Sequence, residues 1–299
     1  MGQSHESVAI DVRLATAPPF AGDLAVSYLG AREVAGVEYV DPGGAYHRTL
    51  NLSGGPGIVS MTPSGEGVSV RLVLSDRGDL TSALDRCHRL FDLGADSVAI
   101  DAHLGDHPPL GDLVRARPGL RSPGAVDGAE MLVRAIVGQQ VSVAGARTVL
   151  GVLAERHGED LPAAIAAHWP GPSRPRTFPR PARLAELNPQ DLPMPRARGR
   201  ALVSAMGEVS KGGLRLDPGD DPTEAAERMQ TIAGIGPWTA SYVALRAFGD
   251  ADVFLASDLA VRRSLAKLEQ PASGPEVVTL AQRWSPWRSY ALHHLWLAS

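Results

Sequence analysis

The sequence predicts an α+β protein in which an N-terminal antiparallel sheet domain precedes an all-helical region. Two observations support this fold class. Residues 8–14, 46–52 and 68–74 alternate apolar and polar side chains, which is the period of half-buried strands. Beyond residue 103 this alternation disappears, and apolar residues recur at helical spacing instead. We therefore expect two parts, a sheet with helices and then helices alone.

The first part, expected over 8–103, also contains helices. Residues 23–32 are predicted to form a helix lying on the sheet. Residues 63–67 have the composition of a turn, which we place between the third strand and the fourth. Asp79 is predicted to cap a helix that ends at Gly94. Together these elements form a compact α+β domain of about a hundred residues.

The second part, expected over 104–299, consists of helices and loops. A helical stretch is predicted over 127–157, and the proline-rich residues 169–181 are predicted to be a surface loop. Asp221 and Pro222 mark a helix start, because a carboxylate can cap the first amides and proline suits the first turn. Short helices are expected from there to the end.

Composition limits the class of protein. With 44% hydrophobic and 21% charged residues, the 299-residue chain has the make-up of a globular protein. No apolar run reaches the roughly 18 residues that a membrane span needs, and no signal peptide is evident at the N-terminus. The single cysteine, Cys87, excludes an internal disulfide and is predicted to be a core residue. We expect a cytoplasmic protein without a membrane partner.

Charge is unevenly distributed. The net charge of −4 argues weakly against nucleic acid as a partner. Residues 174–215, however, contain nine Lys and Arg residues against three acidic ones. This segment is either a local basic surface or a solvated Arg/Pro loop, and the sequence does not choose between them.

One motif carries most of the chemical information. Gly234-Ile235-Gly236 lies between two predicted helices, the second running over 238–248. Two glycines two residues apart allow the chain to reverse and leave its amides bare of side chains. Such amides can bind a phosphate irrespective of base sequence. The alternative is a plain turn between helices.

A carboxylate follows this hairpin. Asp258 comes after a short apolar segment and precedes another predicted helix. It is either a helix cap or a catalytic carboxylate that faces a cleft.

The hairpin followed by Asp258 resembles the helix-hairpin-helix-GPD superfamily of DNA glycosylases. Further blocks resemble one branch of it, bacterial DNA-3-methyladenine glycosylase II (alkylpurine DNA glycosylase). These blocks are residues 117–121, 135–142, 238–242 and 283–291. The similarity extends over nearly the whole chain. It implies a first domain like one repeat of the TATA-binding-protein sheet, and two helical subdomains that flank a cleft.

The resemblance also implies a mechanism. Asp258 matches the family's catalytic aspartate, which stabilises positive charge on the deoxyribose and positions or deprotonates the attacking water. Trp238 stands where related bifunctional glycosylases carry a Schiff-base lysine, which implies base hydrolysis without lyase activity. Gln140 matches the residue that wedges into the gap left by a flipped nucleotide, although glutamines 139 and 140 could instead cap a helix bend. The resemblance thus implies a monofunctional base-excision-repair enzyme that flips and excises alkylated purines such as 3-methyladenine from double-stranded DNA.

Aromatic residues are implied to form the base pocket. Their electron-rich faces attract a cationic purine. Two positions depart from the family pattern, because leucine at 259 and 297 stands where relatives carry tyrosine, which makes the pocket more apolar. The aromatic residues are Tyr28, Trp238, Tyr242 and Trp296.

Other roles rest on the resemblance alone. Hairpin residues Gly234, Ile235 and Gly236, with Thr239 and more weakly Ser241, are expected to contact DNA phosphate. No cofactor is expected to be required, but Na⁺ or K⁺ could bind the backbone carbonyls of Gln230, Ile232 and Gly234. We expect a monomer.

Three alternatives remain open. A bifunctional glycosylase/lyase would need a lysine near Trp238 and usually a four-cysteine cluster, and the sequence has neither. A non-catalytic or altered-specificity helix-hairpin-helix protein that recognises damaged DNA would not need Asp258. A piece of a fusion with an alkyl-transfer module would have its partner outside this sequence.

Overall fold

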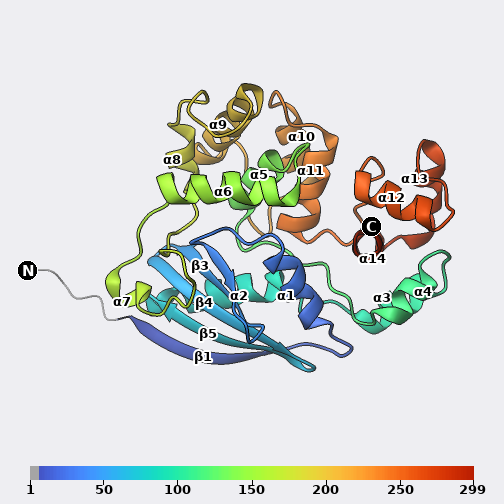
Figure 1. Ribbon diagram of the computed structural model, residues 1–299, viewed down its shortest axis with the longest axis horizontal. Helices are drawn as coiled ribbons and strands as arrows, with labels where there is room; N and C mark the ends of the chain where they lie inside the picture. Colours follow the sequence, from blue (N-terminus) through green and yellow to red (C-terminus); the bar gives the residue numbers. More distant parts are fainter. Residues whose placement is uncertain (1–6) are drawn as a thin grey trace, which may run out of the picture.

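The computed structural model describes residues 7–299 as an antiparallel sheet with one group of helices over it and a second group to one side (Figure 1). The predicted α+β fold class is confirmed. The strands are β1 (Val8–Ala15), β2 (Glu38–Val40), β3 (Tyr46–Leu52), β4 (Gly55–Ser64) and β5 (Gly67–Leu74). The α-helices are α1 (Gly22–Gly30), α2 (Leu80–Leu90), α3 (Ser97–Gly105), α4 (Gly111–Ala116), α5 (Gly128–Val137), α6 (Val143–His157), α7 (Ala163–Ala166), α8 (Pro181–Ala185), α9 (Arg196–Ser210), α10 (Pro222–Gln230), α11 (Pro237–Val243), α12 (Leu259–Lys267), α13 (Pro275–Ala281) and α14 (Arg288–Ala298). A π-helical turn, η2 (Ala244–Phe248), extends α11, and 3-10 turns η1 (Arg77–Asp79) and η3 (Gln282–Trp284) precede α2 and α14.

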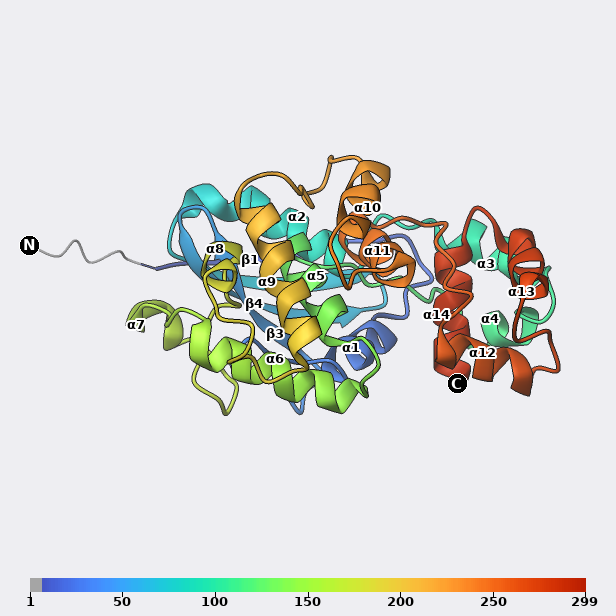
Figure 2. The same cartoon turned by 90° about the horizontal axis from the view of Figure 1, so that it is seen from above.

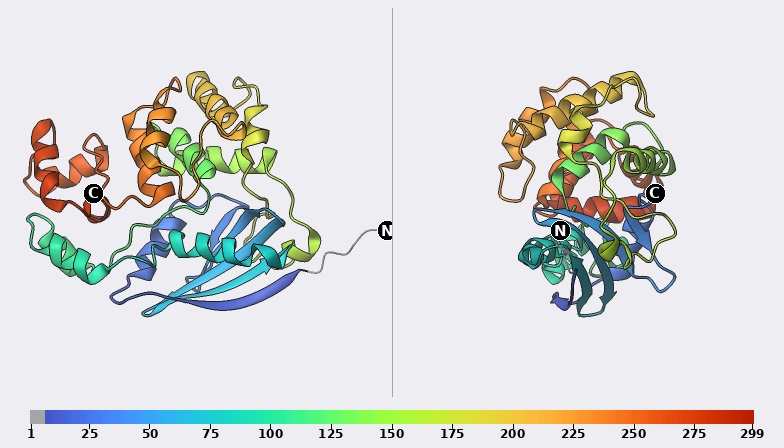
Figure 3. Two further views of the ribbon diagram at one scale, coloured as in Figure 1. Left: turned by 180° about the vertical axis from the view of Figure 1, so that it is seen from behind. Right: turned by 90° about the vertical axis from the view of Figure 1, so that its left-hand side faces the viewer.

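The sheet has the strand order β1-β5-β4-β3-β2, with every neighbouring pair antiparallel. The three predicted strands are confirmed as β1, β3 and β5. The predicted turn at 63–67 joins β4 to β5, which are the fourth and fifth strands, because the three-residue β2 is too short to show a period in the sequence. Helices α1 and α2 bury one face of this sheet (Figure 3).

The core of the sheet domain contains Cys87, as predicted. The predicted cap of α2 is only partly right. Asp79 does occupy the N-cap position of α2, so only the expected capping bond is missing, because its carboxylate accepts hydrogen bonds from Ser53 Oγ and the Gly54 amide instead. The helix also ends at Leu90 rather than near Gly94.

The helices form two groups, each with its own apolar core (Figure 2). We call α5, α6 and α8–α11 the first helical group, and α3, α4 and α12–α14 the second. Helix α3 crosses the predicted boundary at residues 103 and 104, and its Ile100 and Leu104 belong to the second group's core. Segments far apart in the chain therefore build that group.

The stretch predicted as helical over 127–157 is two helices. Helix α5 ends at Val137, and Ser142 caps α6 by accepting a hydrogen bond from the Gly145 amide. Between them Gln140 has φ +54°, which a helix cannot continue through. The predicted helix 238–248 similarly changes to a π-helical turn after Val243.

Most of the arginines in the 174–215 segment are neutralised. Arg174 and Arg176 pair with Asp160, Arg180 with Glu159, Arg183 with Glu186 and Arg215 with Asp220. Three of these acids lie outside the segment, so counting charges within it overstated its basic character. The proline-rich loop at its start is held to the protein by these pairs.

A buried ion network joins the sheet domain to the first helical group. Arg48 on β3 pairs with Glu38 at 3.3 Å and with Glu130 on α5 at 2.8 Å. Arg134, one turn along α5, closes the network with Glu38 and Glu130 at 2.7 Å each. Four charges that satisfy one another can remain buried.

None of the helices in residues 7–299 is long and apolar enough to span a bilayer.

Candidate active site

A cavity of about 520 Å³ opens where α1 of the sheet domain meets both helical groups. It brings together five of the residues expected at the site. Asp258 and the four aromatic residues Tyr28, Trp238, Tyr242 and Trp296 all line it. Because these residues come from α1, α11, α12 and α14, the pocket depends on the packing of all three parts of the molecule.

Asp258 lies at the start of α12, where it both caps the helix and faces the cavity. Its Oδ1 accepts hydrogen bonds from the amides of Ala260 and Val261, at 3.0 and 3.1 Å, so it caps the helix. It also accepts the indole N–H of Trp296 at 3.2 Å on Oδ1 and that of Trp238 at 3.3 Å on Oδ2. Four donors therefore hold the carboxylate at the pocket wall in one orientation.

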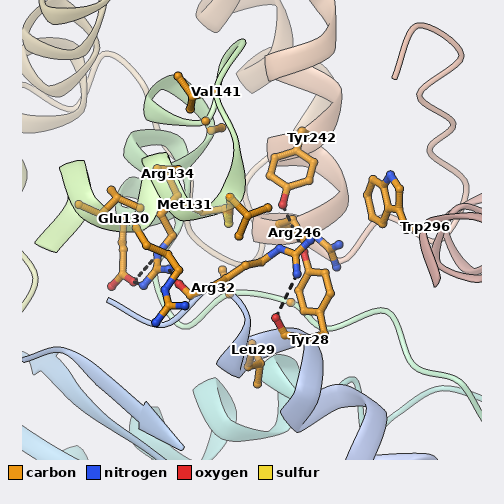
Figure 4. Close-up of a pocket in the computed structure, with 18 of the residues that line it drawn as sticks. Tyr28, Leu29, Arg32, Glu130, Met131, Arg134, Val141, Tyr242, Arg246 and Trp296 are labelled. Carbon is orange, nitrogen blue, oxygen red and sulfur yellow. Dashed lines mark hydrogen bonds and ion pairs between the residues drawn. The ribbon is translucent and has the colours of Figure 1, made fainter. Parts of the chain in front are cut away.

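The aromatic rings are arranged as walls around the cavity. Trp238 stacks on Tyr242 with ring centroids 5.1 Å apart and 9° between planes. Trp296 stands edge-on to Tyr242 at 6.2 Å and 70°. The hydroxyls of Tyr28 and Tyr242 lie 3.2 Å apart, within hydrogen-bond distance, and this contact links α1 to α11 (Figure 4). A flat aromatic ligand would fit such a set of π faces.

Two arginines supply positive charge behind these rings. Arg246, only 2% exposed, lies 4.6 Å from the Tyr28 ring centroid and 5.1 Å from that of Trp296 (Figure 4). Its Nη1 donates to the Pro123 carbonyl. The guanidinium carbon of Arg32 lies 3.8 Å from the centroid of the same Tyr28 ring. The Arg246 guanidinium lies close to three aromatic rings, lines the cavity, and has no hydrogen-bond partner for Nε and Nη2 within the described residues.

These charges perturb the neighbouring titratable groups. Burial raises the pKa of Tyr28 to about 12, although the two arginines act in the opposite direction. Burial also acts to raise the pKa of Tyr242, but Arg246 and Arg32 outweigh it and lower that pKa below its ordinary value. Burial and Arg246 together lower the pKa of His293 well below its usual range. His293 is thus neutral, and its Nε2 lies 2.7 Å from Arg246 Nη1.

The glycine hairpin lies beside the pocket-forming helix α11. Gly234 has φ +94°, a left-handed conformation that favours glycine. The Ile235 side chain is buried in the core of the first helical group, and its amide donates to the Ile232 carbonyl. The amides of Gly234 and Gly236 have no acceptor within the described part of the chain, which leaves them for an external oxygen.

Two polar residues lie behind the hairpin. Gln139 donates from Nε2 to the Gly234 carbonyl at 3.0 Å and to Thr239 Oγ1 at 2.9 Å. Thr239 is buried, so its hydroxyl faces into the protein, and only its backbone could contact a phosphate. Gln140 is exposed in the break between α5 and α6, and it does not line the cavity, whereas its neighbour Val141 does.

Comparison with known proteins agrees with this arrangement. Residues 11–127 match the family model described as the AlkA N-terminal domain. DNA-3-methyladenine glycosylase 2 of Escherichia coli is 36% identical over 287 residues, which cover 93% of this chain and 94% of that protein. The chain belongs to the DNA-3-methyladenine glycosylase 2 family.

Two further relatives place this family in context. A Mycobacterium tuberculosis protein named "Probable bifunctional transcriptional activator/DNA repair enzyme AlkA" is 42% identical over 287 residues. The match covers 96% of this chain but 56% of that protein, so the chain spans little more than half of it. The solved structure of a 3-methyladenine DNA glycosylase from Archaeoglobus fulgidus shares the fold, with a TM-score of 0.78 at 21% identity over 96% of this chain and 97% of that one.

Sequence reasoning about this glycosylase family missed the charged side of the pocket. Arg32 and Arg246 gave no signal, because each is a single arginine within an otherwise ordinary helical segment. The two leucines that depart from the family pattern are not inner walls. Leu259 is 59% exposed at the mouth, and Leu297 is 38% exposed and does not line the cavity. Trp284 is fully buried in the second group's core and is not part of the pocket.

Proposed function

We propose that this chain is a monofunctional DNA glycosylase of base excision repair, which flips alkylated purines such as 3-methyladenine out of duplex DNA and hydrolyses their glycosidic bond. The observation that carries the proposal is Asp258, a carboxylate fixed by two indole N–H groups in a cavity with aromatic walls. The names of the E. coli and A. fulgidus relatives support the same reaction.

In the proposed reaction the bond between C1′ and the purine nitrogen breaks, and its electron pair leaves with the base. Positive charge then develops on the sugar, and the Asp258 carboxylate stabilises it electrostatically. Water adds to C1′ while the carboxylate accepts its proton. An alkylated purine is a good leaving group because it carries a positive charge, so the mechanism needs no general acid. The indole at position 238 cannot form an imine with the sugar, which supports hydrolysis without strand cleavage.

Duplex DNA is the proposed partner, bound by a single copy of the chain. The free amides of Gly234 and Gly236 would bind a backbone phosphate, and the exposed Gln140 would enter the base stack. Flipping a nucleotide costs a few kcal/mol, and the cost is least for damaged bases, which favours extrusion of the damaged base.

A monovalent cation on the carbonyls of Gln230, Ile232 and Gly234 remains part of the proposal. The Ile232 and Gly234 carbonyls each accept one internal hydrogen bond and keep a second lone pair for it. The reaction would take place in the cytoplasm at the nucleoid.

The test is base release from methylated duplex DNA in single turnover by the wild type, Asp258→Asn and Asp221→Asn. Asparagine still caps helices, so both variants keep their helix starts. Asp221 is the matched control, since it caps α10 away from the pocket. We expect Asp258→Asn to lower the rate by about 10²–10⁴-fold and Asp221→Asn to leave it unchanged.

Three outcomes would contradict the proposal. An Asp258→Asn rate equal to that of the wild type would remove the catalytic role and leave the carboxylate as a helix cap. Wild-type binding to damaged DNA without any base release would favour a non-catalytic damage-recognition protein. Strand nicking by the wild type without added alkali would overturn the monofunctional assignment.

A further inference from the structure

Exposed apolar side chains gather at the mouth of the pocket. Six large hydrophobic residues are markedly exposed in the described part of the chain, at 98, 141, 143, 259, 278 and 297. Val141, Val143 and Leu259, exposed by 41, 46 and 59%, all line the pocket, and Leu297 directly follows Trp296. Isolated exposed apolar residues need no explanation, but a cluster around one opening does.

The cluster has two sides that belong to different parts of the fold. Val141 follows Gln140 in the break between α5 and α6, and Val143 is the first residue of α6, so both belong to the first helical group. Leu259 is the first residue of α12 in the second group, directly after Asp258. We call Val141, Val143 and Leu259 the apolar collar. It borders the opening through which a base must enter.

The collar faces outward, so its ligand lies outside the cavity. A flipped base inside the pocket would touch the aromatic walls, whereas Leu259 directs more than half of its surface to solvent. Arg263, one turn along α12, is also exposed at this mouth and has no ion-pair partner within residues 7–299. Apolar side chains next to a free cation fit a ligand with apolar faces and phosphates.

We propose that the apolar collar packs against the unstacked bases and deoxyribose faces of the nucleotides on both sides of the flipped one, and that Leu259 is a second positioning residue that holds the duplex open opposite Gln140. This rests on the proposed function, because it takes damaged duplex DNA as the ligand. Proteins that kink DNA commonly insert apolar wedges between base steps, which agrees with this use of Leu259. Arg263 contacts the adjoining phosphate.

The test measures DNA distortion without base excision. The wild type, Leu259→Ala, Leu259→Gln and Val278→Gln are titrated into a duplex that carries an uncleavable abasic-site analogue with 2-aminopurine beside it. Binding is followed by anisotropy and unstacking by 2-aminopurine fluorescence. Val278 on α13 is the matched control, since it is 47% exposed and does not line the pocket. Thermal unfolding of each variant confirms that it is folded.

We expect both Leu259 variants to bind the abasic duplex roughly tenfold more weakly, the equivalent of losing part of a leucine's burial. Their fluorescence increase at saturation should also be smaller. Val278→Gln should match the wild type in both measurements. Because glutamine has nearly the size of leucine, failure of Leu259→Gln as well as Leu259→Ala would show that the contact is apolar.

Other outcomes would overturn the inference. Leu259 variants that bind and unstack like the wild type would leave Leu259 without a role in opening DNA. A loss of self-association in these variants, with unchanged DNA binding, would assign the collar to contact between copies of the chain. If the wild type distorts abasic DNA through Leu259 yet releases no damaged base, the collar stands and the proposed glycosylase activity fails.

Discussion

At the scale of single residues, Asp258 both caps a helix and faces a cavity, which its sequence position left as alternatives. The same oxygen that caps α12 accepts the indole N–H of Trp296, and the second oxygen accepts that of Trp238. Capping therefore fixes the carboxylate and is compatible with the catalytic role that we propose for it. A helix cap that faces a cavity is a rigid way to present a carboxylate, because the backbone amides and the indoles constrain it from different directions.

Replacing Trp296 by phenylalanine keeps an aromatic ring at this position but removes the indole N–H that donates to Asp258. The pocket keeps an aromatic wall, while Asp258 loses a donor that helps to orient it. We expect Trp296→Phe to slow single-turnover base release roughly tenfold, the scale of one hydrogen bond to a charged group. Trp287→Phe makes the same chemical change in the second group's core without a bond to Asp258. Equal rates for the two variants would mean that the indole bond does not matter.

Residue chemistry also marks the limit of what the sequence predicts. Asp258 and the three aromatic residues of the helical region could be located from motifs, because each lies in or soon after a recognisable block, whereas Tyr28 was assigned from the resemblance over the whole chain. Arg246 could not, since its importance comes from three rings that meet only in the folded chain. Asp79 stands at the predicted N-cap position of α2, but its hydrogen bonds to the distant turn Ser53–Gly54 could not be predicted from local sequence.

At the scale of elements, the hairpin and the break between α5 and α6 form one unit. Gln139 bonds to both the Gly234 carbonyl and Thr239, and Arg198 on α9 donates to the Gln139 carbonyl. The hairpin was predictable from its two glycines, because a turn with a left-handed residue favours glycine, and Gly234 is that residue here. The break was not, because residues 127–157 have a continuous helical composition and only Ser142 signals a new start.

Gly234→Ala tests this unit. A side chain at φ +94° is strained, and its Cβ would lie 3.1 Å from that of Ala201. We expect a loss of about 1–2 kcal/mol in the free energy of unfolding and weaker binding to undamaged and damaged duplexes alike, measured by urea unfolding and anisotropy. Gly207→Ala within α9 is the control, since its Cβ would meet no atom within 4 Å. Lesion-selective weakening in Gly234→Ala would argue against a phosphate role.

At the scale of the whole molecule, three apolar cores meet at one pocket. The alternating sequence pattern located β1, β3 and β5, although in the structure burial alternates along the whole of β1 only, and β3 is buried at nearly every position. The assembly of α3 and α4 with α12–α14 could not be predicted from local pattern, since it joins segments that are distant in the chain. That assembly buries His293 and His294 on α14.

These histidines predict how stability depends on pH. Burial lowers the pKa of His294 to about 4, and that of His293 is also depressed. In the unfolded chain a histidine has a pKa of about 6.5, so between these values the unfolded state binds protons that the folded state excludes. The free energy of unfolding is therefore fully present above pH 6.5 and falls as the pH drops through this window.

We expect His294 to contribute a loss of roughly 2 kcal/mol between pH 7 and pH 5, measured by urea unfolding at both values. His294→Leu should reduce this loss, whatever its own effect on stability at pH 7. His168→Leu, at an exposed position, should leave the pH dependence as it is in the wild type. An identical pH dependence in all three proteins would show that His294 does not contribute.

The ion network between β3 and α5 has a consequence for how this architecture can be divided. Removing the sheet domain would leave Glu130 and Arg134 with each other but without Arg48 and Glu38. Breaking such a buried network costs about 3–5 kcal/mol, a large part of a domain's stability. The helices by themselves would thus require a different α5 sequence, because the sheet domain supplies two of the four charges that stabilise one another in the network.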